Sequence, residues 1–181
     1  MEPVDHAKLG FKCGLEIHQQ LATSKLFCRC ETKDLPAEPG KPDFVFRRRL
    51  RPTQSELGEI DAAALREARR HRRFEYHGYQ GHACLVDSDE EPPHEASREA
   101  TDVALTMSLL LSARPVEEIQ WMRKIVIDGS NTSGFQRTGL VSLGGMVDDV
   151  AVQTLALEED SCQRISETPD TVVFGLDRLG I

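Results

Sequence analysis

The sequence predicts an α+β fold, in which a mixed or antiparallel sheet is flanked by helices. Two observations predict this class. Several short segments show the period-two alternation or the run of β-branched residues that is typical of strands. Two longer segments instead carry alanine or apolar residues at helical spacing. The chain has 181 residues, of which 39% are hydrophobic, enough for a domain with a buried core.

Composition and charge limit the class of protein and the cellular compartment that the sequence suits. The net charge of −8 argues against a generally basic nucleic-acid-binding protein, but it allows a local basic patch. No apolar run reaches the roughly 20 residues that span a bilayer, so we expect no membrane partner. Residues 1–12 are mixed and polar, unlike a signal peptide. The five cysteines, an odd number, then indicate a reducing cytoplasm and free or metal-bound thiols.

The first predicted strand is residues 14–18. Glu16 and His18 alternate with apolar residues, so they share one face while the apolar side chains face the core. A carboxylate beside an imidazole on a rigid element suits a metal ion or a phosphate-bearing ligand. The alternative is a solvated polar face with an ordinary charged hydrogen bond.

Two cysteines at C-x-C spacing, Cys28 and Cys30, follow this strand. Two thiolates so close hold Zn²⁺ when further ligands arrive from elsewhere in the chain. The later cysteines, Cys84 and Cys162, and several histidines are the candidates for those ligands. The alternative is a pair of reduced, partly buried thiols.

A positive region extends from Arg47 to Arg73 in this acidic chain. It follows a proline-rich loop, predicted over 31–43, and a short strand, predicted over 44–46. It includes a predicted helix over 60–73 that is rich in alanine and arginine. The arginines could neutralise RNA phosphates. A solvated helix paired with neighbouring glutamates is an equally good interpretation.

The clearest predicted helix covers 100–111 and belongs to the core scaffold. A strand predicted over 121–128 leads into a loop, 128–134, that is rich in glycine, serine and threonine. Arg123 and Lys124 precede this loop. Its backbone N–H groups could wrap a phosphate between these cations, although it lacks the Walker A pattern. A hairpin turn is the alternative.

The last predicted strand, 150–157, ends in three consecutive carboxylates at Glu158, Glu159 and Asp160. Three adjacent carboxylates repel one another unless a positive group neutralises them. Mg²⁺ bound to ATP is a common reason for such a cluster in an enzyme. A solvated acidic turn is the alternative.

Together these motifs resemble the tRNA-dependent amidotransferase subunits of the GatB/GatE family. The resemblance rests on GLEIH at 14–18, SKLFCRC at 24–30, the Arg123–Lys124 pair and LEED at 157–160. The segments LRPTQSELGE at 50–59 and RKIVIDGSNTSGFQRT at 123–138 are similar to GatE, the archaeal type of glutamyl-tRNA(Gln) amidotransferase subunit. The resemblance covers nearly the whole chain.

The resemblance implies an ATP- and Mg²⁺-dependent carbon–nitrogen ligase that converts Glu-tRNA(Gln) to Gln-tRNA(Gln). The γ-carboxylate of the tRNA-bound glutamate would be phosphorylated, and ammonia from an asparaginase-like partner, the D subunit of the amidotransferase, would displace the phosphate. The implied fold over 1–181 is part of an α+β cradle with a GatE-type insertion at about 31–82. The implied catalytic residues and Mg²⁺ ligands are Glu16, His18 and Glu159. The residues implied near the nucleotide or the tRNA 3′ end are Arg123, Lys124, Ser130, Asn131, Ser133 and Gln136.

The chain departs from the family pattern in two respects. It stops at Ile181, where family members continue into another metal-binding glutamate and tRNA-binding domains, so we expect an N-terminal fragment with little activity alone. Bacterial relatives hold zinc with C-x-C plus C-x-x-C, whereas only Cys84 stands where the second pair would be. A zinc site at Cys28, Cys30 and Cys84 would therefore be one ligand short. The alternative function is a non-catalytic tRNA- or partner-binding module that uses Arg47–Arg73.

Overall fold

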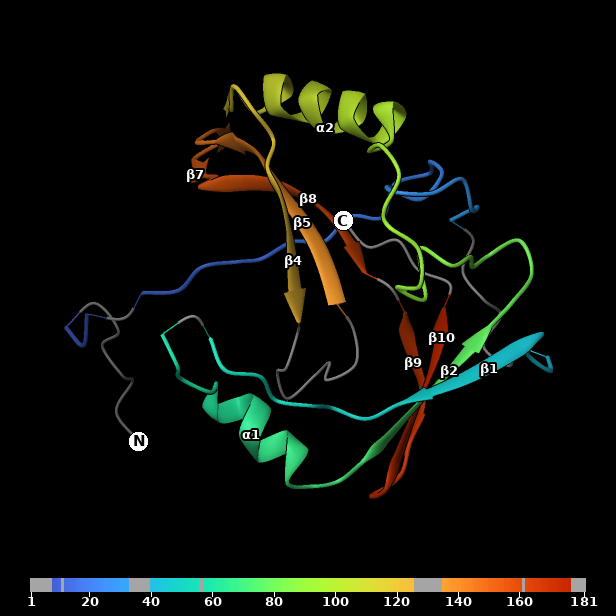
Figure 1. Cartoon of the computed structure of the whole chain (residues 1–181). Coiled ribbons are helices and arrows are strands. Elements are labelled where there is room, and N and C mark those ends of the chain that lie inside the picture. The colour runs from blue at the N-terminus through green and yellow to red at the C-terminus, as the bar shows by residue number, and fades with distance from the viewer. Residues whose placement is uncertain are drawn as a thin grey trace, which may run out of the picture.

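The computed structural model describes residues 8–10, 12–32, 40–55, 57–125, 135–160 and 162–176. Two helices and two four-stranded sheets dominate this part of the chain (Figure 1). The helices are α1 (Ala62–Ala68) and α2 (Arg98–Leu110). Their combination with mixed and antiparallel sheets confirms the predicted α+β class. In the described residues no helix is both long enough and apolar enough to cross a membrane.

The first sheet has the strand order β1-β2-β10-β9 and is mixed. Its strands β2 and β10 are parallel, while the outer pairs are antiparallel. Aromatic side chains form its core, where Tyr76 stacks on Phe174 with ring centroids 5.6 Å apart. The strands are β1 (Phe44–Arg48), β2 (Arg73–Gly78), β9 (Gln163–Glu167) and β10 (Thr171–Leu176).

The second sheet is antiparallel and has β5 at its centre. This strand pairs with β3, β4 and β8, and α2 packs across β5 and β8 (Figure 1). Between β5 and β8 in the sequence, β6 and β7 form a small antiparallel hairpin. The elements are β3 (Arg114–Pro115), β4 (Trp121–Ile125), β5 (Phe135–Leu143), β6 (Met146–Val147), β7 (Val150–Ala151) and β8 (Thr154–Asp160).

The prediction of a helix over 100–111 is confirmed by α2. It was predictable because the residues that cap this helix and those that it buries lie within one continuous segment. The hydroxyl of Ser97 caps the helix by accepting a hydrogen bond from the amide of Ala100 at 3.3 Å. Ala100, Ala104 and Ser108 lie one helical turn apart and are buried against the sheet. The hydroxyl of Ser108 also donates to Ser142 across this interface at 2.9 Å.

Helix α1 is shorter than the predicted 60–73. It begins after the N-cap Asp61, whose carboxylate accepts from the amide of Ala64 at 2.8 Å. It ends at Ala68, because His71 adopts a left-handed backbone with φ of 52°. Arg72 then turns into the protein and Arg73 begins β2, so the arginines are divided between a helix, a turn and a strand.

The prediction of a strand over 14–18 is wrong. Residues 12–20 form no strand or bridge in this structure, and Leu15 and Ile17 are 87% and 84% exposed. Alternation marks a strand only where a partner strand and a core receive the two faces, and the described residues provide neither here. By contrast, the strands predicted at 44–46 and 121–128 are confirmed as β1 and, within its described part, as β4.

The strand predicted over 150–157 is in fact two strands. β7 ends at Ala151, and β8 begins at Thr154 and continues through the three carboxylates to Asp160. The carboxylates therefore lie within a ladder instead of in a turn, since β5 places Arg137 and Thr138 directly opposite Glu159 and Glu158. The predicted loop over 128–134 and residues 33–39 lie outside the described residues.

Candidate functional site

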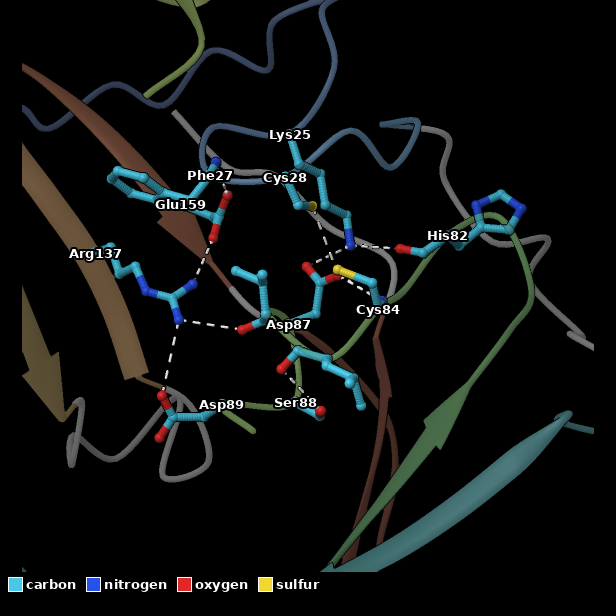
Figure 2. Close-up of polar contacts among 12 residues, drawn as sticks. Lys25, Phe27, Cys28, His82, Cys84, Asp87, Ser88, Asp89, Arg137 and Glu159 are labelled. Atoms are coloured by element: carbon cyan, nitrogen blue, oxygen red, sulfur yellow. Dashed lines mark hydrogen bonds and ion pairs between the residues drawn. The ribbon is translucent and has the colours of Figure 1, made fainter. Parts of the chain in front are cut away.

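Two buried polar networks meet at one turn, residues 84–89 (Figure 2). On one side, Asp87 faces Lys25 and the thiols of the cysteine loop, residues 24–31. On the other side, the carbonyl of Val86 and the carboxylate of Asp89 face Arg137. The turn therefore connects a thiol-rich cluster to the carboxylate-bearing strand β8.

The cysteine loop is closed by local backbone contacts. Ser24 and Glu31 form a bridge, and the amide of Lys25 donates to the carbonyl of Cys30 at 3.0 Å. The same loop is anchored to the start of α2, because the amide of Ser97 donates to the carbonyl of Leu26 at 2.7 Å. These contacts close the loop that carries the two cysteines and fix it beside the start of α2.

The thiol cluster consists of Cys28, Cys30, Cys84 and Asp87. One ligand atom of each lies within 4.8 Å of the others, and this is the one such group of three or more metal-binding side chains in the described residues. Cys28 and Asp87 are buried, whereas Cys30 and Cys84 are partly exposed. Three sulfurs and one carboxylate oxygen at this spacing fit the tetrahedral coordination of Zn²⁺, and the partial exposure leaves a path for entry.

Burial decides the protonation chemistry of this cluster. Burial and the nearby carboxylate of Asp87 raise the pKa of Cys28 far above its usual value, and they raise the pKa of Cys30 to about 11. Burial disfavours the charged form of Lys25, yet the ion pair with Asp87 outweighs it and raises the pKa of Lys25. These shifts favour the neutral thiols of Cys28 and Cys30 and the charged form of Lys25.

The second network is an ion pair between Arg137 on β5 and Glu159 on β8. Nη1 of Arg137 lies 2.8 Å from Oε1 of Glu159, and both side chains are almost fully buried. Nη2 of Arg137 donates to the carbonyl of Val86 at 3.1 Å. The other oxygen of Glu159 accepts from the amide of Phe27 at 3.2 Å, so the cysteine loop also contacts this pair.

Two opposing effects act on the Glu159 carboxylate. Burial and the charge of Asp87 raise its pKa, while Arg137 and the amide of Phe27 lower it, and the net shift is upward. A buried carboxylate with a raised pKa on a rigid strand is typical of functional sites, although structural ion pairs produce the same signature.

The residues predicted to form one centre do not gather in this structure. Glu16 and His18 lie close together, with Oε1 and Nε2 3.4 Å apart, but their side chains are 85% and 56% exposed. Glu159 is in the core and is held by Arg137. Among the described residues, Glu16, His18 and Glu159 do not form a group whose ligand atoms lie within 4.8 Å of one another. Their roles as Mg²⁺ ligands stay predictions.

Three of the residues predicted near the nucleotide, Arg123, Lys124 and Gln136, lie on strands β4 and β5. In the backbone register, Arg123 is opposite Arg137, which is opposite Glu159, and Lys124 is opposite Gln136. Strands β4, β5 and β8 thus place these positions in two adjacent rows. Ser130, Asn131 and Ser133 lie outside the described residues.

Sequence reasoning missed two members of this network, Lys25 and Asp87. The spacing Cys84-x-x-Asp87 contained the signal for Asp87, because a carboxylate can replace the second thiol of a C-x-x-C pair as a zinc ligand. Lys25 gave no local signal at all. No histidine of the described residues belongs to this cluster, and Figure 2 shows the ring of His82 turned away from the sulfurs of Cys28 and Cys84.

Comparison with known proteins defines the class. The GatB/GatE catalytic domain matches residues 11–181, and the chain belongs to this family. It is 55% identical to the E subunit of glutamyl-tRNA(Gln) amidotransferase from Methanothermobacter thermautotrophicus, over 98% of this chain and 29% of that protein. It is 51% identical to the E subunits of Methanobrevibacter smithii and Thermococcus gammatolerans, over 98% and 99% of this chain and 29% of each relative. The chain thus spans less than a third of the length of these relatives.

Proposed function

We propose that this chain contributes to an ATP- and Mg²⁺-dependent centre that activates glutamate on Glu-tRNA(Gln) for amidation. The observation that carries the proposal is the buried Arg137–Glu159 pair in a sheet whose neighbouring strand bears Arg123 and Lys124. The membership in the GatB/GatE family and the identity to archaeal E subunits supply the substrate class.

The proposed chemistry is phosphoryl transfer followed by displacement. A carboxylate is a poor electrophile, so ATP would first phosphorylate the γ-carboxylate of the tRNA-bound glutamate. Ammonia, supplied by the asparaginase-like D subunit, would then displace the phosphate and leave Gln-tRNA(Gln). Mg²⁺ and cationic side chains would neutralise the charge that spreads over the transferred oxygens.

In this proposal Glu159 exchanges partners when it binds Mg²⁺. Arg137 holds the carboxylate in place before the ion arrives, and Glu16 and His18 would join when residues 12–20 pack onto the strand. We expect little activity from these 181 residues alone, because the three proposed ligands are not gathered here. As a translation enzyme, the protein would act in the cytoplasm.

The test is a chimaera in which this chain replaces the aligned segment of the Methanothermobacter thermautotrophicus relative, an alignment of 183 residues. Combined with its asparaginase-like partner, the chimaera should amidate Glu-tRNA(Gln) with ATP. Glu159→Gln should reduce tRNA-dependent ATP hydrolysis by about 100-fold or more, since an electrostatic group at the reacting phosphate typically contributes this much. Glu167→Gln, a carboxylate paired with arginine in the other sheet, is the matched control. Near-normal ATP hydrolysis by Glu159→Gln would contradict the proposal.

We also propose that the thiol cluster binds one Zn²⁺ as a structural ion. The spacing within 4.8 Å supports this, and Asp87 supplies the ligand that the cysteine pattern lacked. The wild-type chain purified without added metal should contain zinc, and Cys30→Ser should not. Zinc should be retained in Cys13→Ser, because Cys13 is exposed and outside the cluster. A zinc-free wild-type chain that also fails to bind added Zn²⁺ would refute this site.

A second candidate function is RNA binding by the positive region. Arg66 on α1, Arg69 at its C-cap and Arg73 at the start of β2 are exposed. Arg72 is instead buried against Glu67, with Nε and Oε1 2.5 Å apart, so part of the region serves folding. Replacing the three exposed arginines with alanine should reduce the salt dependence of tRNA binding by up to about 0.9 per lost phosphate contact. An unchanged salt dependence would contradict RNA binding by these arginines.

A further inference from the structure

The carboxylate of Asp87 is shared between a lysine and the thiols (Figure 2). Its Oδ1 lies 2.9 Å from Nζ of Lys25. Its Oδ2 accepts from the amide of Cys84 at 2.8 Å and lies 3.8 Å from Sγ of Cys28. One oxygen is therefore held by an ammonium group, and the other faces the sulfur atoms.

Lys25 is enclosed to an unusual degree for a lysine. Its side chain is 0% exposed and that of Asp87 is 1% exposed. Nζ also donates to the carbonyl of His82, so the ammonium has two protein partners. Burying an ammonium and its carboxylate partner costs several kcal/mol, and a pair of apolar side chains of similar size would fill the same space without that cost. The charge at this position thus needs a reason beyond packing.

The charge of a bound metal provides that reason. Zn²⁺ surrounded by three thiolates and one carboxylate retains a double negative charge, which is costly in a buried site. A cation on the outer oxygen of a ligand offsets part of this charge and fixes the orientation of the ligand. Lys25 is such a cation, because it binds Oδ1 of Asp87 while Oδ2 of Asp87 faces the thiols.

We propose that Lys25 is the positioning and charge-balancing residue of the zinc centre, acting through Asp87. The inference rests on the zinc site proposed above. Lys25 also links the two halves of the cluster, since its backbone closes the cysteine loop and its side chain binds the turn. Removal of the charge therefore weakens zinc binding without removing any ligand.

The experiment titrates Zn²⁺ into the metal-free chain against a chromophoric chelator. Lys25→Met should still bind one equivalent of zinc, with an affinity about 10- to 100-fold lower than that of the wild type. Lys41→Met is the matched control, because Lys41 is exposed, and it should bind as the wild type does. An affinity of Lys25→Met within twofold of the wild type would overturn the role of Lys25 and leave the zinc site standing. Failure of the wild type to bind would overturn both.

A second measurement uses the unmodified chain in case Lys25→Met does not fold. The protons of an enclosed ammonium exchange slowly enough for detection by ¹⁵N-edited NMR, while those of exposed lysines do not. One equivalent of Zn²⁺ should shift the Lys25 Nζ resonance and saturate at that ratio. A zinc-loaded chain, verified by metal analysis, with an unshifted Nζ resonance would show that Lys25 does not sense the centre.

Discussion

The buried Arg137–Glu159 pair gives the sharpest stability prediction. Arg137→Met keeps a stem of similar length but removes the charge opposite Glu159, whose exposed fraction is 2%. Glu159 would then keep its hydrogen bond from the amide of Phe27, while the carbonyl of Val86 would lose the donor Arg137. Breaking a buried ion pair by removing one partner costs roughly 3–5 kcal/mol of unfolding free energy. We expect a loss of about 4 kcal/mol.

Urea unfolding of the 181-residue chain measures this loss. The chain has one tryptophan, Trp121, which packs edge-on against Phe27 with ring centroids 5.1 Å apart, so its fluorescence reports on this core. With a slope of about 2 kcal/mol per molar urea, the midpoint should fall by about 2 M. Arg164→Met is the matched control, because it breaks an exposed pair with Glu167 and should cost at most about 1 kcal/mol.

The double substitution Arg137→Met/Glu159→Met separates the ion pair from general damage to the core. Replacing both partners leaves no unpaired charge at this position, so most of the lost stability should return. Chelator is kept in every sample so that zinc does not contribute. The reasoning fails if Arg137→Met is no less stable than Arg164→Met, or if the double variant is less stable than Arg137→Met.

Two further predictions address the sheets and the pH dependence. Gly139→Ala should cost about 1–3 kcal/mol, since its Cβ would lie 2.6 Å from Cε3 of Trp121. Gly40→Ala is the control, because its Cβ would meet no atom of the described residues within 4 Å, and equal urea midpoints would contradict the prediction. The hydrogen bond from Arg72 lowers the pKa of Glu167 below its usual 4.5. The stability that Glu167 contributes is therefore complete above the pKa of the unfolded state, and it is lost as the pH falls through the pKa of the folded state. Glu167→Gln should therefore flatten the decline in the free energy of unfolding between about pH 5 and pH 3. An unchanged decline in this variant would show that Glu167 does not cause it.

Local chemistry made some elements predictable. Helix α2 was predictable because its cap at Ser97 and its buried face lie within one continuous segment. The β-branched run after Trp121 and the short aromatic segment at Phe44 likewise predicted strands that the structure contains. The errors at 14–18 and at the end of α1 arose where a pattern depended on a distant partner or on one residue with positive φ.

The sequence by itself determined the fold class, the family and the identity of several residues in the two buried networks. It placed Cys28 and Cys30 together and flagged Glu159, because those signals come from neighbouring residues. Only the tertiary structure brought Asp87 to Lys25 across 62 positions, and Arg137 to Glu159 across 22. The reason is physical: buried charges need partners, and the partner is chosen by strand register and turn geometry, which span segments far apart in the chain.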